Sequence, residues 1–152
     1  MRHRCWGGFS LVELTVVLAI TAIVTVVATP MLLSYWDSWS LQAGARELAS
    51  AINLGRQLAI ATRSPICVDL NGTNLRFRVG GCAGEVWKGS VTDASGSIRI
   101  SDPTTVAISS NGRLVFTTLG AATPAATYTL RHVRTQASRA VVVAGSGRIS
   151  VE

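Results

Sequence analysis

Glu13 is the residue whose chemistry is hardest to reconcile with its surroundings. It stands near the front of an apolar run, behind Gly7-Gly8 and a short stub that carries Arg2 and Arg4. A carboxylate in an apolar phase is costly unless a positive group pairs with it or it reaches water at the lipid boundary. The sequence therefore predicts either a cationic partner for Glu13 or a place for it at the lipid–water interface.

No other group of residues predicts catalysis. The histidines are His3 and His132, and neither lies in a hydrolase motif. No glycine-rich loop has phosphate-binding spacing, and no cysteine–histidine cluster has zinc spacing. His132, between Arg131 and Val133, is expected to be an exposed strand residue or a weak phosphate contact. We expect no enzyme activity, no metal and no cofactor.

The segment that must position Glu13 is residues 9–33. From Leu14 to Leu33 the chain has 20 residues without a charge, which as a helix would span about 30 Å, the thickness of a bilayer core. A transmembrane helix is the first interpretation. A cleaved secretory signal is the alternative, but the run is long and ends in a poor cleavage site. Because the basic stub is expected to stay in the cytoplasm, the chain after Leu33 is expected outside it.

A second helical pattern follows in residues 34–63. Its apolar residues recur at steps of three or four, namely Leu41, Ala45, Leu48, Ile52, Gly55 and Ala59. We expect an amphipathic helix that continues the membrane segment with little break. Pro30 lacks a backbone N–H and is expected to loosen or kink the first half.

Residues 64–152 have the pattern of short strands and turns. Strands are expected at residues 66–70, 75–79, 85–91, 97–101, 104–109, 113–118, 127–133, 139–144 and 148–152. Asn71-Gly72 and Asn111-Gly112 each predict a hairpin, residues 145–147 predict a further turn, and residues 121–126 predict a mobile loop. The fold class is therefore α+β: one long N-terminal helix followed by an antiparallel β-sheet domain.

Two cysteines, Cys67 and Cys82, flank the first predicted hairpin. Outside the cytoplasm thiols oxidise, so a disulfide is expected, and it would stabilise the fold by about 3 kcal/mol in the chain-entropy description. Two free, partly buried thiols are the alternative. Cys5 lies in the stub and has no partner there.

The formal net charge is +6, and it falls to +4 without the two arginines of the stub. A mildly basic exterior suits anionic lipid, nucleic acid or an acidic subunit. The final 22 residues carry Arg131, Arg134, Arg139 and Arg148 against Glu152. In a hairpin some of these arginines would share one face. They predict either contact with DNA phosphates or a solvated basic edge that deters aggregation.

The start of the chain resembles the type III signal of type IV pilins and pseudopilins. The matching features are a basic stub ending in Gly7-Gly8, then Phe9, then Glu13 as the fifth residue after Gly8, then the apolar run. The resemblance implies that residues 1–8 are a leader, that a prepilin peptidase cuts after Gly8, and that it N-methylates Phe9.

The same resemblance gives Glu13 a partner. In a filament, the glutamate of one subunit would pair with the new amine of Phe9 on a neighbour and so favour one axial register. The apolar run would serve first as a membrane anchor and then as the filament core. Pro30 matches a proline near which the helix of this family loosens during assembly.

Later segments resemble the GspH/FimT family. These segments are ARELASAINLGRQLAIATR before a cysteine-bearing strand, VWKG at residues 86–89, NGRLVF, and the closing GSGRIS. The resemblance implies a minor pseudopilin of type II secretion or a minor pilin of type IV pili. Such a subunit is present in few copies near the filament tip, and its partners are other minor and major pilins or pseudopilins.

The resemblance also implies a single pass through the inner membrane, with residues 64–152 in the periplasm. Some members of the GspH/FimT family bind DNA during natural transformation through a C-terminal GRxR-like motif. Here Gly147 and Arg148 match the start of that motif, whereas Ser150 replaces its second arginine.

Overall fold

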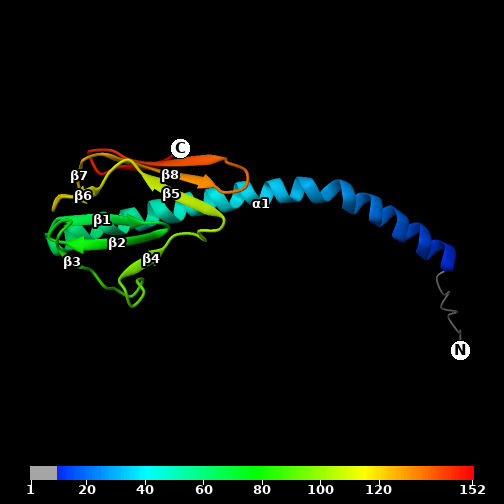
Figure 1. Cartoon of the computed structure of the whole chain (residues 1–152), viewed down its shortest axis with the longest axis horizontal. Helices are drawn as coiled ribbons and strands as arrows, with labels where there is room; N and C mark the ends of the chain where they lie inside the picture. The colour runs from blue at the N-terminus through cyan, green and yellow to red at the C-terminus, as the bar shows by residue number, and fades with distance from the viewer. Residues whose placement is uncertain (1–9) are drawn as a thin grey trace, which may run out of the picture. The chain divides into compact units, whose positions relative to one another are not determined.

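A computed structural model of the chain describes residues 10–152 (Figure 1). Its elements are α1 (Leu11–Thr62), β1 (Ile66–Asn71), β2 (Asn74–Val79), β3 (Glu85–Val86), β4 (Ser97–Arg99), β5 (Val106–Ser110), β6 (Leu114–Phe116), β7 (Ala122–Thr123), β8 (Ala126–His132), β9 (Ser138–Val143) and β10 (Ile149–Val151). A long helix followed by antiparallel strands confirms the predicted fold class.

α1 is a single helix that joins the two predicted helical segments and continues through Pro30 without a break. The chain divides into two compact units, and the boundary between Trp36 and Asp37 lies inside this helix. The second unit, Asp37–Glu152, contains the last part of α1 and all the strands.

The strands form two antiparallel sheets. One has the order β3-β2-β1-β6-β7, in which β4 also pairs with β2, at the opposite end of β2 from β3. The other has the order β10-β9-β8-β5. The hairpin of β1 and β2 turns through Gly72-Thr73, as Asn71-Gly72 predicted. β9 and β10 form the expected C-terminal hairpin, in which Val143 pairs with Ile149.

The core lies between α1 and both sheets. The predicted stripe is buried: Leu41, Ala45, Leu48, Ile52, Gly55 and Ala59 all lie in the interior. Apolar residues of the sheets complete the core, among them Phe77, Phe116, Tyr128 and Leu130. Period-3.6 spacing on the helix and period-2 spacing on β2 and β8 both direct apolar side chains to this interior.

One predicted hairpin is wrong. Asn111-Gly112 connects β5 to β6, but these strands do not pair with each other. β5 pairs with β8 in one sheet, and β6 pairs with β1 in the other. The dipeptide makes a turn, as its residue types favour, and the turn carries the chain from one sheet to the other.

The remaining differences are local. Residues 121–126 are not a free loop, because Ala122 and Thr123 form β7 against β6, and Ala122 and Ala126 are buried. Of the strand expected at 85–91, only Glu85–Val86 pairs with β2. Beyond it Gly89 packs against the ring of Trp87, where a Cβ would collide, and the chain there takes no strand form.

Candidate functional site

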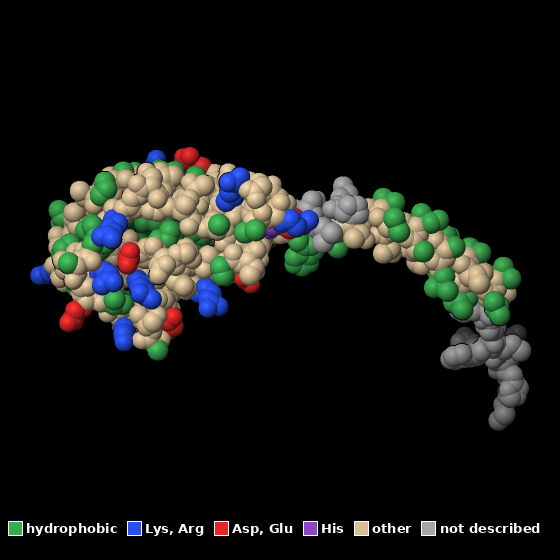
Figure 2. Space-filling model, in the orientation of Figure 1, with side chains coloured by type: hydrophobic (Ala, Val, Ile, Leu, Met, Phe, Trp, Pro, Cys, Tyr) green, Lys and Arg blue, Asp and Glu red, His purple; other side chains and the backbone are tan. Residues whose placement is uncertain are grey.

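The first part of α1 is apolar on every side and uncovered. The segment Leu11–Thr29 is long and apolar enough to cross a membrane, with a mean hydropathy of 2.5, and none of it is buried in the isolated chain. Every large apolar side chain from Leu11 to Val27 is at least 49% exposed, and Figure 2 shows apolar side chains along this segment. A helix that is apolar all round requires an apolar surrounding, either lipid or other helices.

Four threonines interrupt this segment without leaving a hydroxyl unpaired. Thr15, Thr21, Thr25 and Thr29 each donate to a backbone carbonyl three or four residues earlier, with O···O distances of 2.7–2.9 Å. Because a polar group without a partner is costly in an apolar phase, these internal bonds make the threonines compatible with lipid or with a dry helix bundle.

Glu13 lies in the first turn of α1, and its side chain is exposed in the isolated chain. It is the one Asp, Glu, Lys or Arg between Phe9 and Trp36 in the sequence. Gly7, Gly8 and Phe9, the residues of the predicted processing site, lie outside the described residues. Glu13 is therefore the one acidic group that the first part of α1 brings to a neighbouring molecule.

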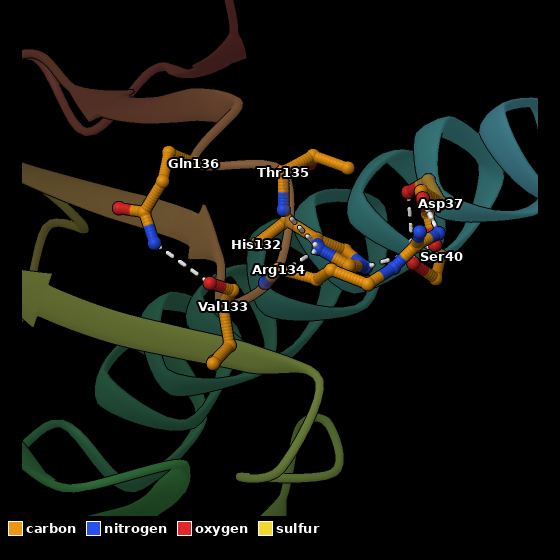
Figure 3. Close-up of polar contacts among 7 residues, drawn as sticks. All are labelled: Asp37, Ser40, His132, Val133, Arg134, Thr135 and Gln136. Carbon is orange, nitrogen blue, oxygen red and sulfur yellow. Dashed lines mark hydrogen bonds and ion pairs between the residues drawn. The ribbon is translucent and has the colours of Figure 1, made fainter.

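A polar cluster missed by the sequence analysis joins α1 to the β8–β9 turn (Figure 3). Asp37 accepts a hydrogen bond from the guanidinium of Arg134, and its other oxygen lies 3.4 Å from Nε2 of His132. The bond from Arg134 holds the pKa of the Asp37 carboxyl below its ordinary value. In the sequence, Asp37 could have indicated this cluster, because it is the one acidic residue among the aromatic residues that follow the apolar run.

His132 is not the exposed residue that was expected, because it is only 4% exposed. Its Nδ1 accepts hydrogen bonds from the backbone N–H groups of Arg134 and Thr135, at 3.2 and 3.3 Å. The other ring nitrogen, Nε2, faces the carboxylate of Asp37. His132 is thus a buried structural link and has no access to a phosphate.

The four C-terminal arginines do not gather on one face. Arg134 is held by Asp37. Arg139 pairs across the sheet with buried Leu130, whereas Arg131 pairs with Ser138. Since residues opposite one another in an antiparallel pair share a face, Arg139 lies on the core side of its sheet and Arg131 on the outer side. Arg131 and Arg139 therefore do not share a face, and contact of these arginines with DNA stays a prediction.

Arg148 lies apart from the other three, beside α1. It lines a groove of about 390 Å³ together with Arg56, Ser50 and Asn53. Arg56 donates a hydrogen bond from Nε to the carbonyl oxygen of Gly120 at 2.9 Å. The same oxygen lies so close to Gly147 that a Cβ on residue 147 would stand 1.9 Å from it. The β9–β10 turn therefore needs glycine at 147, and it holds Arg148 near Arg56.

The predicted disulfide is present. Cys67 on β1 and Cys82 in the turn after β2 are bonded, with a Cα–Cα distance of 5.0 Å. Cys67 is fully buried. The bond links the turn between β2 and β3 to β1, the central strand of its sheet.

Solved structures of three proteins share this fold. The type IV minor pilin FimU of Pseudomonas aeruginosa PAO1 is 21% identical, with a TM-score of 0.58 over 78% of this chain and 92% of FimU. The minor pseudopilin EpsH of the Vibrio cholerae type 2 secretion system is 12% identical, with a TM-score of 0.57 over 74% and 96%. GspH of E. coli is 14% identical, with a TM-score of 0.56 over 73% and 86%.

No curated protein sequence matches the chain. A protein family does, and its description is type II transport protein GspH. The match covers residues 44–147, which take in the buried half of α1 and the strands up to the β9–β10 turn. This is more than half of the chain, so the protein belongs to the GspH family of type II transport proteins.

Proposed function

We propose that this protein is a minor pilin or pseudopilin, a structural subunit of a type IV pilus-like filament near its tip, in type II secretion or in a type IV pilus. The observation that carries the proposal is the exposed apolar half of α1 with one carboxylate in its first turn. Such a segment is stable in lipid and also among the apolar helices of neighbouring subunits in a filament core.

In the membrane stage, the apolar half of α1 anchors the chain in the inner membrane. The stub with Arg2 and Arg4 stays in the cytoplasm, and the unit Asp37–Glu152 stands in the periplasm. The disulfide supports this side of the membrane, because such bonds persist in oxidising compartments.

In the assembly stage, a prepilin peptidase removes residues 1–8 and methylates Phe9. The new amine of Phe9 and the carboxylate of Glu13 on a neighbouring subunit then neutralise each other in the apolar core of the filament. A buried charge without a partner is strongly destabilising, so this pairing selects the axial position at which each subunit enters.

The test is the intact mass of the full chain after expression with a prepilin peptidase. The wild-type chain is expected to lose residues 1–8 and gain one methyl group. Gly8→Val is expected to keep Met1, because the peptidase requires a residue without a side chain at this position, while Gly7→Ala serves as the control and is processed. A wild-type chain that still begins at Met1 in the presence of the peptidase would show that the proposal is wrong.

DNA contact during uptake is a second candidate function, and one observation favours it. Arg56 and Arg148 line the same groove, and its described lining includes no carboxylate. Two phosphate contacts imply a slope of log K against log salt of roughly −2 on duplex DNA. Arg148→Ala is expected to reduce that slope by about one, whereas Arg131→Ala, on the outer face of β8, leaves it unchanged. No binding at low salt would exclude this function.

A further inference from the structure

The chain from Val106 to Phe116 belongs to both sheets and leaves an opening where it changes from one to the other. Its second part, β6, pairs with β1 as far as Leu114 opposite Val68. Its first part, β5, pairs instead with β8. Beyond Leu114 and Val68, β5 and β1 therefore diverge, and each has an edge without a neighbouring strand in residues 10–152.

The register shows which backbone groups lie on the open edge of β5. Asn111 donates to the carbonyl of Thr127 at 3.1 Å, so the backbone groups of Asn111 face β8. Backbone groups alternate between the two edges of a strand. Those of Ser109 and Ala107 therefore also face β8, and the N–H and C=O groups of Ile108 and Ser110 face the opposite edge.

The same reasoning places Leu70 on the open edge of β1. Asn71 and Asn74 close the two-residue turn of the β1–β2 hairpin, so the backbone of Asn71 faces β2. The N–H and C=O groups of Leu70 face the other way, on the edge where β6 pairs with Ile66 and Val68. β6 begins only at Leu114, and no strand of the described chain lies opposite Leu70.

A groove of about 420 Å³ lies between these two edges, with Val68, Leu70, Ile108 and Ser110 among its lining residues. At one end it is closed by the turn that contains Gly112 and Arg113, which line it as well. Unpaired strand edges are templates for a further strand, which native proteins otherwise shield with charge, proline or a covering loop. Here the open edges of β5 and β1 both face the groove.

We propose that this groove binds an extended segment of a partner protein, which adds to β5 as a further strand and reaches Leu70 of β1. An extended backbone supplies N–H and C=O groups on both of its edges, so it can pair with Ile108 and Ser110 on one side and Leu70 on the other. The added strand would join the two sheets where the chain itself leaves them apart.

The side chains of the groove define the sequence that fits. Ile108 pairs with buried Leu130 and Leu70 with buried Leu75, so both point to the core side and favour an apolar residue of the bound strand. Arg113 stands exposed at the closed end. Asp69 lines the groove as well, and its carboxylate pairs with Arg78 at 3.7 Å. Within residues 10–152 no carboxylate pairs with Arg113.

Successive residues of a strand point to opposite faces. A bound strand with an apolar residue toward Leu70 and Ile108 would therefore carry its next residue toward the outer face. An acidic residue there would meet Arg113. The segment that fits alternates apolar and acidic residues, and this inference does not depend on whether the chain is processed at Gly8.

The test measures binding of a fluorescein-labelled hexapeptide of alternating valine and aspartate to the full chain in lipid nanodiscs. Two comparison peptides are one of alternating valine and lysine, and one with the valines and aspartates in separate blocks. The alternating valine–aspartate peptide is expected to bind in a saturable manner and more tightly than both.

Two variants locate the binding. Ser110→Pro removes the N–H on the open edge but no bond to β8, and it is expected to weaken binding by about tenfold or more. Ser110→Ala keeps that N–H and is expected to bind like the wild type. Arg113→Glu is expected to reverse the preference, so that the valine–lysine peptide binds better than the valine–aspartate peptide.

The proposal is overturned if no peptide binds in a saturable manner, if the block peptide binds equally well, or if Ser110→Pro binds like Ser110→Ala. Circular dichroism establishes that each variant is folded. If Ser110→Pro does not fold, a failure of Arg113→Glu to change the preference overturns the proposal on its own. A dimer of the wild type that Ser110→Pro abolishes would assign the groove to a second copy of this chain and overturn the assignment to a different protein.

Discussion

Gly55 of α1 lies directly against the ring of Phe77 on β2, so that a Cβ on Gly55 would stand 2.7 Å from Cε1 of the ring. No real Cβ makes so close a contact, and both residues are buried. Gly55→Ala is therefore expected to destabilise the fold by about 1–3 kcal/mol through overpacking. Urea unfolding of the full chain in detergent, followed by tryptophan fluorescence, measures this change.

Gly44 is the matched control, because it is a second buried glycine of the same helix. The nearest atom to a Cβ at Gly44 is Cδ2 of Leu130 at 3.5 Å, an ordinary contact. Gly44→Ala is expected to stabilise the fold by up to about 1 kcal/mol through helix propensity. Equal changes in the two variants would contradict the packing argument.

Asp37 is expected to make stability depend on acid pH. Its pKa in the folded protein is lowered, chiefly by the hydrogen bond from Arg134. A lowered pKa contributes stability above the pKa of the unfolded chain, and that contribution is lost as pH falls through the folded value. Asp37→Asn is expected to lower Tm at pH 7, and its difference from wild type is expected to shrink below about pH 4.

The control for this prediction is Arg134→Gln. If the pair acts as a unit, the double variant loses less Tm than the two single losses added together. A difference in Tm between wild type and Asp37→Asn that stays constant from pH 7 to pH 3 would show that the charge of the carboxylate contributes nothing to stability.

Tyr128 is expected to be replaceable by phenylalanine with a gain in stability. Its side chain is fully buried, its hydroxyl has no hydrogen-bond partner among the described residues, and burial raises its pKa. Removing an unsatisfied buried hydroxyl relieves a desolvation cost, so Tyr128→Phe is expected to stabilise by about 1 kcal/mol. A loss of stability on the same urea assay would mean that the hydroxyl has a partner.

The disulfide is expected to contribute about 3 kcal/mol, given the length of the loop it closes. Cys67 is fully buried, whereas Cys82 is partly exposed. Cys67→Ser is therefore expected to cost more than Cys82→Ser, because it also buries a hydroxyl. Thiol titration of the unfolded full chain before and after reduction counts the bond. Cys5 alone is expected to react before reduction, and three reactive thiols before reduction would contradict the bond.

Glu13→Ala is expected to leave processing and membrane insertion intact but to impair entry into the filament. The reason is that the amine of Phe9 on the neighbouring subunit would lose its counter-charge in an apolar surrounding. Glu13→Gln, which keeps the length and removes the charge, is expected to fail in the same way. Normal piliation or secretion in a strain that carries either variant alone would refute this role.

The sequence allowed the long helix, its buried stripe and two hairpins to be predicted, because each has a local signal. The spacing from Leu41 to Ala59 is that of a helix face, and Gly72 stands where a two-residue turn needs it. Asn111-Gly112 carries the same local signal as Asn71-Gly72. The hairpin predicted at Asn111-Gly112 is wrong because a turn dipeptide does not determine whether the two strands that it connects pair with each other.

The polar residues were harder to predict, because their roles depend on contacts between distant parts of the chain. Asp37 and Arg134 are 97 residues apart, and no local pattern connects them. His132 was expected at the surface on the strength of its charged neighbour, yet the alternation of β8 turns it inward. The same alternation separates Arg131 from Arg139, whose sheet register only the structure gives.

The burial pattern of α1 divides one continuous helix into regions of different local stability. The first core residue of the helix is Leu41, and the second compact unit begins at Asp37. Opening the backbone between Pro30 and Asp37 would expose none of the core side chains that the structure describes, whereas opening past Leu41 would take apart the centre of the domain. Amide hydrogens of residues 31–36, beyond the apolar segment, should therefore exchange through small local openings, and those after Leu41 only when the domain as a whole unfolds.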